Sequence, residues 1–124
     1  MTRILVVDDE FQMRELMKAY LENAGYVVDV AEHGKEALEK LRKESFDLVI
    51  LDLSMPEVGG LDVLKILRNN PKHRRLPVLM CTSSSVTREV DSVFEAGANG
   101  YLVKSMFDEK KIVEKVKSVL PKPT

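Results

Sequence analysis

Three consecutive acids, Asp8, Asp9 and Glu10, follow directly on an apolar run at residues 4–7. Like charges this close repel each other, and at an effective dielectric of about 20 two carboxylates about 4 Å apart cost roughly 4 kcal/mol. A bound divalent cation removes that repulsion, because it supplies positive charge between the acids. The acidic run therefore predicts a cation site at this point of the chain.

Other residues able to take part in chemistry stand at similar places in the sequence. Asp52, Thr82, Ser83 and Lys104 all lie at the ends of short apolar runs. Carboxylates are ligands that Mg²⁺ prefers, and Mg²⁺ commonly binds one or two of them together with oxygens of a phosphate group. A hydroxyl and an ammonium can contact the remaining phosphoryl oxygens. The set predicts a Mg²⁺ site that accepts a phosphoryl group.

Each of these residues also has an ordinary structural role. Asp9 or Glu10 could cap a helix, and Asp52 could be a turn residue. Thr82 could fill space at a strand end, and Lys104 could be a solvated surface charge. Taken singly these roles are the better interpretation, but they do not explain why acids, a hydroxyl and a lone lysine all stand at strand ends.

The elements that must position these residues follow from the periodicity of the apolar residues. Five short runs rich in β-branched residues and bounded by turn residues predict strands at residues 4–7, 26–30, 48–51, 78–81 and 101–103. The segments between them have helical spacing, and Gly25 and Gly97 are predicted to end the first and fourth helices. A third helix is predicted at residues 61–68. In the other four helices the predicted inward positions are Met13, Leu16, Met17, Tyr20, Leu21 and Ala24 in the first, Ala37, Leu38 and Leu41 in the second, Val86, Val90, Val93 and Phe94 in the fourth, and Ile112, Val113, Val116, Val119 and Leu120 in the last.

Strand and helix alternate five times, which is typical of an α/β fold. Parallel neighbours need crossover connections, so the pattern predicts a doubly wound, five-stranded parallel sheet with helices on both faces. In such sheets the functional crevice lies outside the carboxyl ends of the strands. The chemically able residues are expected at that edge.

Composition limits the class of protein. The chain has 124 residues, with 19 basic and 20 acidic side chains and a formal net charge of −1, so it has no general attraction to nucleic acid or to an anionic membrane. The single Cys81 cannot form an internal disulfide, and no apolar run has the length of a signal peptide or membrane span, so a cytoplasmic protein is expected. Residues 1–120 are expected to form one domain and residues 121–124 a tail or the start of a linker. His33 and His73 are expected at the surface.

Taken together, these motifs resemble the receiver domain of two-component response regulators, of the CheY-like type. The resemblance covers nearly the whole chain and implies a flavodoxin-like (βα)5 fold with strand order 2-1-3-4-5. It also implies a signalling switch that assists its own phosphorylation and dephosphorylation and does not turn over an external substrate. The residues that carry it are 7–9, 31–34 with 37 and 38, 47–52 with 55, 56 and 60, 76–80 with 82, and 96–104.

The resemblance implies a role for each site residue. Asp52 would be the phosphoacceptor, which receives a phosphoryl group from a histidine kinase or a small donor such as acetyl phosphate. Asp9 and Asp52 would bind Mg²⁺ directly, together with the backbone carbonyl of Ser54, and Asp8 would act through a water molecule. Lys104 would pair with a phosphoryl oxygen.

The resemblance further implies a conformational response. Thr82 would turn its hydroxyl onto the phosphoryl group, and Tyr101 would then rotate inward and repack the face formed by the fourth helix, fifth strand and fifth helix. The implied partners are a sensor kinase or phosphotransfer protein and a downstream target that binds this face, with a phosphatase as a further candidate. The unphosphorylated chain would be a monomer, with dimerisation on activation left open, and this domain alone would bind neither nucleic acid nor membrane.

The sequence departs from the family pattern in two loops. Proline usually follows the lysine, but here Ser105 follows Lys104, so we expect a trans bond between these residues and one extra residue in the loop. Ser105 and Asp108 have the spacing of a helix capping box. In the other loop the pair Gly59 and Gly60 is predicted to lower the order of the segment after the acid.

Two small residues flank the expected phosphoryl group. Ser54 and Ser84 stand two positions after Asp52 and Thr82. Neither would block or strongly orient an attacking water molecule, so a short to intermediate phosphoryl lifetime is expected.

Other functions agree less well with these motifs. A haloacid-dehalogenase-like phosphohydrolase would need Asp-x-Asp after its first strand, whereas Glu10 stands two positions after Asp8. A flavodoxin-like electron carrier would need a Ser/Thr/Gly-rich phosphate cradle where this chain has acids. An alternative within the family is the N-terminal receiver of a larger response regulator.

Overall fold

The computed structural model describes residues 1–83, 87–106 and 108–121, without the side chains of residues 87–89. This part of the chain alternates strand and helix as expected, and the strand predictions are correct to within one residue at every end. The strands are β1 (Arg3–Val7), β2 (Val27–Ala31), β3 (Leu48–Asp52), β4 (Val78–Thr82) and β5 (Gly100–Val103), and the helices are α1 (Phe11–Asn23), α2 (Gly34–Lys43), α3 (Gly60–Arg68), α4 (Thr87–Glu95) and α5 (Glu109–Val119).

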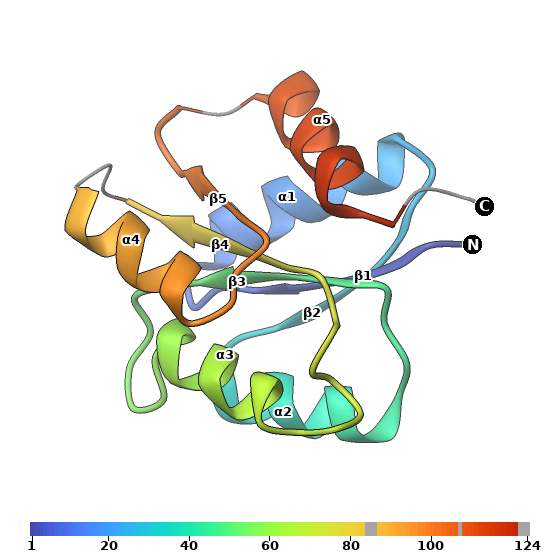
Figure 1. Ribbon diagram of the computed structural model, residues 1–124. Helices are drawn as coiled ribbons and strands as arrows, with labels where there is room; N and C mark the ends of the chain where they lie inside the picture. Colours follow the sequence, from blue (N-terminus) through green and yellow to red (C-terminus); the bar gives the residue numbers. More distant parts are fainter. Residues whose placement is uncertain (84–86, 107, 122–124) are drawn as a thin grey trace.

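The strands form one parallel sheet in the order β2-β1-β3-β4-β5 (Figure 1). Every neighbouring pair is parallel, and β1 lies between β2 and β3. The chain therefore moves to one side of β1 and then crosses to the other side, which creates the switch point where such sheets place their sites. The predicted fold class and strand order are confirmed.

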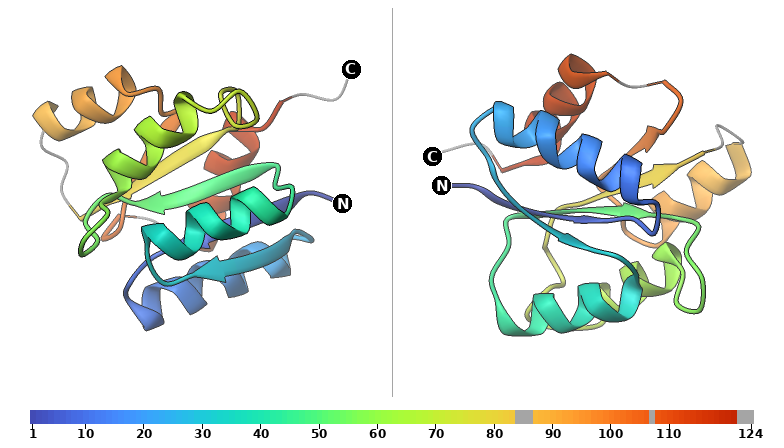
Figure 2. Two further views of the ribbon diagram at one scale, coloured as in Figure 1. Left: turned by 90° about the horizontal axis from the view of Figure 1, so that it is seen from below. Right: turned by 180° about the vertical axis from the view of Figure 1, so that it is seen from behind.

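Helices cover both faces of the sheet (Figure 2). Leu5 and Val7 of β1 belong to the core under α2, α3 and α4, whereas Ile4 and Val6 belong to the core under α1 and α5. All four are fully buried, because successive side chains of a strand point to opposite faces and both faces are covered. The central strands are thus fixed from both sides, which makes their carboxyl ends a rigid base for a site.

The helix ends follow local capping rules. Gly25 and Gly97 have φ angles of 97° and 104°, as a left-handed residue after a helix requires, and they stand just beyond α1 and α4 as predicted. His33 is the N-cap of α2, and its Nδ1 accepts a hydrogen bond from the Glu36 amide at 3.1 Å. This ring is exposed, in agreement with the prediction.

Some predicted inward positions are wrong. Leu16 is 42% exposed and Ala24 is exposed, because the buried face of α1 is narrower than its apolar pattern and includes Arg14 instead. Phe94 is 44% exposed and packs edge-on against Tyr101, with the ring centroids 5.8 Å apart. Apolar periodicity identified the helices correctly but not the width of their buried faces.

His73 is buried, so the prediction of a surface position is wrong. Its Nε2 lies 3.0 Å from the carbonyl oxygen of Leu41, and Lys72 Nζ donates to the carbonyl of Arg42 at 3.1 Å. The loop between α3 and β4 thus covers the C-terminus of α2, whose last carbonyls need donors from outside the helix.

The connection from β5 to α5 agrees with one prediction and corrects another. No peptide bond among the described residues is cis, so the Lys104–Ser105 bond is trans as predicted. The capping-box prediction is wrong, because Asp108 is itself the N-cap of α5 and accepts from the Lys111 amide at 2.9 Å. Ser105 lies instead in a turn that the Met106 amide closes on the carbonyl three residues earlier.

Several predictions fall on residues that the structure does not describe. The flanking role of Ser84, the inward position of Val86 and the tail from residue 122 onward lie outside the described residues. None of the helices in the described part of the chain has the length and apolar character that a membrane span requires.

Candidate functional site

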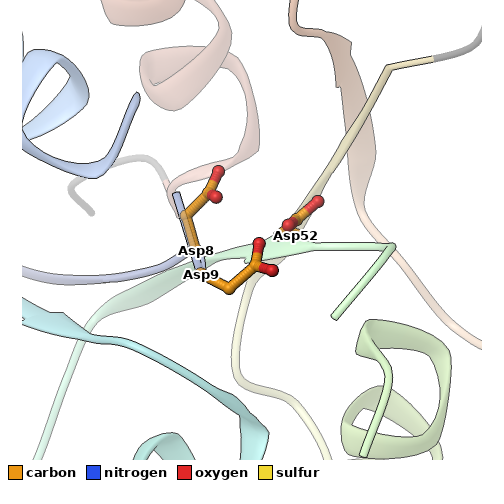
Figure 3. Close-up of side chains that lie close together, drawn as sticks. All are labelled: Asp8, Asp9 and Asp52. Carbon is orange, nitrogen blue, oxygen red and sulfur yellow. The ribbon is translucent and has the colours of Figure 1, made fainter. Parts of the chain in front are cut away.

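Three carboxylates meet at the carboxyl edge of the sheet (Figure 3). Asp8 and Asp9 follow β1, and Asp52 is the last residue of the neighbouring strand β3. Each offers an oxygen that lies within 4.8 Å of the others. The sheet register thus brings together acids more than forty positions apart in sequence, as the strand-end argument predicted.

The two acids after β1 differ in their surroundings. Asp8 is fully buried, and its Oδ1 accepts a hydrogen bond from the Glu10 amide at 2.9 Å. Its own amide donates to the carbonyl of Ala31 at 3.2 Å, which extends the contact with β2 by one residue. Asp9 is exposed. The buried acid is therefore held by the protein, and the exposed acid is accessible to a ligand.

Lys104 supplies positive charge to this cluster. Its Nζ lies 2.9 Å from Asp8 Oδ2 and 3.2 Å from Asp52 Oδ1. Burial lowers the pKa of Lys104, but the two carboxylates outweigh burial and raise the pKa above its usual value. The ammonium therefore stays charged, yet one positive charge faces three carboxylates.

Asp52 combines deep burial with a carboxylate oxygen that has no hydrogen-bond partner among the described residues. It is only 2% exposed, and its Oδ1 accepts a hydrogen bond from the Ser54 amide at 3.3 Å. Its Oδ2 is buried and has no hydrogen-bond partner among the described residues. Burial and the charge of Asp8 raise the pKa of Asp52 to about 7, although Lys104 opposes the shift. Both findings indicate that this edge lacks positive charge.

The donor set fits a divalent cation. Carboxylate oxygens within reach of one another are ligands for hard cations, and a buried carboxylate oxygen without a donor is costly to the fold. A cation would offset both the repulsion and the missing contact. Chemically, the arrangement can bind such an ion and present a carboxylate oxygen to an electrophile.

Other predicted site residues surround the cluster. Thr82 ends β4 and is buried, and its carbonyl accepts from the Lys104 amide at 2.7 Å. Ser54 follows Asp52 by two positions and is exposed. Tyr101 is half-buried on β5, where it pairs with Met80, two residues before the pair formed by Thr82. Thr82 and Tyr101 thus lie on adjacent strands, two positions apart in the register, and share one face of the sheet.

The loop after β3 brings a second backbone segment onto the site. The Gly60 amide donates to the carbonyl of Leu53 at 3.1 Å. A Cβ added at Gly60 would lie 2.1 Å from the carbonyl oxygen of Asp52, whereas one added at Gly59 would make its nearest contact at 3.6 Å. The predicted lower order of this loop stays a prediction. Glycine is required at position 60 for a different reason, because the backbone of Asp52 leaves no room for a Cβ atom there.

Sequence reasoning missed one residue of the site. Arg14 on α1 is 6% exposed, and its Nη1 donates to the carbonyl of Asp8 at 2.9 Å. The available signal was its spacing, since Arg14 precedes the buried Met17 and Leu21 by three and seven positions and so shares their face. A charged residue on a buried face needs partners.

Comparison with protein-family models gives one match over most of the chain. Residues 4–117 match the response regulator receiver domain. Among characterised proteins, the transcriptional regulatory protein ResD of Bacillus subtilis (strain 168) is 39% identical over 119 residues, which are 96% of this chain and 48% of ResD. SrrA of Staphylococcus aureus (strain NCTC 8325 / PS 47), also a transcriptional regulatory protein, is 36% identical over 94% of this chain and 47% of its own length. The chain spans about half the length of these two regulators.

Solved structures agree with this match. The chemotaxis protein CheY4 of Vibrio cholerae aligns with a TM-score of 0.92 and 33% identity over 97% of this chain and 99% of that chain. The response regulator TrrA of Thermotoga maritima, in complex with Mg(2+)-BeF, aligns with a TM-score of 0.86 and 43% identity. The alignment covers 97% of this chain and 100% of the TrrA chain.

Proposed function

Because the chain belongs to the response regulator receiver domain family, we propose that it is a phosphorylation-controlled switch of a two-component system. Members of this family are signalling proteins and not metabolic enzymes. The observation that carries the proposal is the buried Oδ2 of Asp52, which has no hydrogen-bond partner among the described residues and lies in a cluster of three acids beside Lys104.

Asp52 is the phosphoacceptor in this proposal. One of its carboxylate oxygens attacks phosphorus in line, and a bond forms between that oxygen and phosphorus. The bond between phosphorus and the leaving atom of the donor breaks, and the leaving group keeps the electron pair. The product is an acyl phosphate. The unpaired Oδ2 supports this role, because no protein donor has to be displaced before it attacks.

Mg²⁺ is the proposed cation. Asp9 and Asp52 would bind it directly, with the backbone carbonyl of Ser54, and Asp8 would act through a water molecule. The acid cluster supports this assignment, as does the Mg(2+)-BeF complex of TrrA. When bound, the ion supplies the positive charge that lets a phosphoryl group approach the carboxylates.

The remaining residues act on the phosphoryl oxygens. Lys104 pairs with one of them as a point charge, and its contacts of 2.9 Å and 3.2 Å to Asp8 and Asp52 support this role by placing the ammonium beside the acceptor. Thr82 turns its hydroxyl to another oxygen. Its position at the end of β4, with its carbonyl hydrogen-bonded to the Lys104 amide, supports that movement.

Tyr101 relays the change to the surface. As Thr82 moves, the ring rotates inward and repacks the face formed by α4, β5 and α5. Its edge-on contact with the exposed Phe94 supports this, because rotation of Tyr101 would alter a contact at the surface. The proposed partners are a sensor histidine kinase or phosphotransfer protein and a target that binds this face, all in the cytoplasm, and the unphosphorylated protein is a monomer.

The domain limits are part of the proposal. Residues 1–120 form the receiver and residues 121–124 a tail or the start of a linker, which is supported by the end of α5 at Val119. A second form of the proposal makes the chain the receiver half of a larger regulator. ResD and SrrA support this form, since each is about twice as long as the segment they share with this chain.

The test is incubation with acetyl phosphate. With Mg²⁺ we expect about one phosphoryl group per chain, detected by intact mass and removed by base or hydroxylamine as an acyl phosphate would be. With excess chelator we expect almost none, because positioning and charge neutralisation supply most of the catalysis of phosphoryl transfer. Phosphate esters assayed in parallel should show no sustained release. Equal incorporation with and without Mg²⁺ would contradict the metal part of the proposal, and sustained release would favour a phosphohydrolase.

The raised pKa of Asp52 predicts a pH-dependent affinity for Mg²⁺. The carboxyl has a pKa of about 7 without metal, so a proton competes with the ion as the pH falls. We expect Mg²⁺ to bind about tenfold more weakly near pH 6 than near pH 8. Calorimetric titration at a series of pH values measures this. An affinity that does not change over this range would contradict it.

The same shift predicts the pH dependence of stability without metal. The folded pKa of about 7 lies above the ordinary value of 3.8, so the folded state holds the proton more tightly than the unfolded state. This contribution to the free energy of unfolding is complete below about pH 4 and is lost as the pH rises through about 7. Urea denaturation in chelator should show this loss, and Asp52→Asn should lack it.

A further inference from the structure

Arg14 makes its contact with the backbone of the acid pair and not with its carboxylates. We propose that Arg14 is a positioning residue, whose guanidinium holds the carbonyl of Asp8 and thereby directs Asp9 toward the cation. The inference rests on the proposed function and adds a residue of α1 to it. Nη1 donates to this carbonyl at 2.9 Å from a side chain that is almost fully buried.

The carbonyl of Asp8 depends on such a donor. Val7 is the last residue of β1 with partners in the sheet, where it pairs with Ala31 and Leu51. The carbonyl of Asp8 lies beyond this pair, in a turn that the sheet ladder no longer covers. A buried carbonyl without a donor costs free energy, and Arg14 supplies the donor.

Holding this carbonyl also fixes the direction of Asp9. The carbonyl of Asp8 and the amide of Asp9 belong to one planar peptide unit, so the position of the oxygen determines the position of the next Cα. The flanking groups are fixed too, since Glu10 donates to Asp8 Oδ1 at 2.9 Å and accepts from the Arg14 amide at 3.0 Å. Asp9 is exposed, so its direction comes from this backbone more than from packing.

The surroundings of Arg14 favour a role in the site over one in stability. Its Nη2 lies 3.7 Å from Glu32, and its guanidinium carbon lies 5.4 Å from the ring centroid of Phe11. Its Nε is buried without a hydrogen-bond partner among the described residues. A buried guanidinium that leaves one donor unpaired costs stability, which is typical of residues retained for function.

Arg3 provides a matched control at the opposite end of β1. It donates to the carbonyl of Ser45 at 3.0 Å, pairs with Glu44 at 3.0 Å and lies 4.7 Å from the ring centroid of Phe46. It therefore makes the same three kinds of contact as Arg14, far from the acid cluster. The Arg3 side chain is 35% exposed and that of Arg14 only 7%, so the comparison is made between folded proteins, in which loss of contacts away from the acid cluster should leave the Mg²⁺ affinity unchanged.

The experiment compares Arg14→Met, Arg14→Lys and Arg3→Met with the unchanged protein. Mg²⁺ affinity is measured by calorimetric titration near pH 8, and folding by urea denaturation in chelator. We expect Arg14→Met to weaken Mg²⁺ binding by about 10-fold to 100-fold, the usual effect of removing a group that orients a metal ligand. Arg14→Lys, which keeps one donor, should recover part of the loss, and Arg3→Met should keep the full affinity.

The outcomes separate this inference from the proposed function. A folded Arg14→Met protein that binds Mg²⁺ like the unchanged chain overturns the inference and leaves the switch intact. An equal loss of affinity in Arg3→Met also overturns it, because the effect would then come from stability alone. Failure of the unchanged chain to bind Mg²⁺ would instead contradict the metal part of the proposed function, on which this inference rests. If Arg14→Met does not fold, the lysine variant decides.

Discussion

Asp52→Asn is expected to reduce phosphoryl incorporation from acetyl phosphate to background, a loss of at least about 100-fold in the adduct detected by mass. Asparagine has nearly the same shape, but its amide is a far weaker nucleophile than a carboxylate. Asp52 Oδ2 is buried without a hydrogen-bond partner among the described residues, and the neighbouring buried oxygen, Asp8 Oδ2, lies 2.9 Å from the ammonium of Lys104, so the two acids are not equivalent acceptors. The measurement is intact mass after incubation with Mg²⁺ and the donor.

The loss should not come from unfolding. The substitution removes a buried charge that lies beside Asp8, so the metal-free variant should be at least as resistant to urea near pH 8 as the unchanged protein. Asp47→Asn serves as the control at the other end of the same strand, where Asp47 is exposed and accepts from the Arg3 amide at 2.8 Å. This variant should incorporate phosphoryl normally. Incorporation that persists in Asp52→Asn would identify another acceptor.

Gly60→Ala is expected to destabilise the fold by about 3–5 kcal/mol or to prevent folding. The added Cβ would lie 2.1 Å from the carbonyl oxygen of Asp52 and 2.9 Å from the Cα of Leu53. Both neighbours are backbone atoms at the end of a central strand, so they cannot move aside as a flexible side chain could. Intrinsic helix propensity would favour alanine by about 1 kcal/mol, which is too little to offset the clash.

Gly59→Ala is the matched control, one residue earlier. Its added Cβ would make ordinary contacts, 3.6 Å to the carbonyl oxygen of Leu53 and 3.9 Å to Asp62. The φ angle at Gly59 is −72°, which alanine adopts without strain. We expect its free energy of unfolding to change by less than about 1 kcal/mol. Similar urea midpoints for the two variants would show that the loop moves away from Asp52 readily.

Local rules determined much of the fold. The apolar runs predicted five strands, and Gly25 and Gly97 marked helix ends because few other residues adopt a positive φ. The acids at strand ends predicted the edge where the site lies, since parallel strands with crossover helices bring their carboxyl ends to one side. These signals are short in range or follow from a general rule of chain connection, so one sequence is enough to read them.

The predictions that proved wrong depended on contacts between distant segments or on turn geometry. His73 is buried because its loop covers the end of α2, about thirty residues earlier in the chain, and Phe94 stays 44% exposed while it forms a T-shaped ring pair with Tyr101. The capping of α5 by Asp108 depended on how many residues the turn at Ser105 would use. Each outcome depends on a contact or a turn geometry that residue type and spacing do not specify.

The sequence by itself determined the class of site: strand-end acids, a hydroxyl and a lysine at one edge of a parallel sheet. Only the tertiary structure decided that Asp8 is buried while Asp9 is exposed, that Lys104 pairs with Asp8 and Asp52, and that Asp52 Oδ2 lacks a hydrogen-bond partner among the described residues. The physical reason is that residue type states which charges a chain carries, whereas burial and pairing depend on the distances set by packing. Those distances control desolvation and Coulomb energy, and therefore which carboxylate is left in need of a cation.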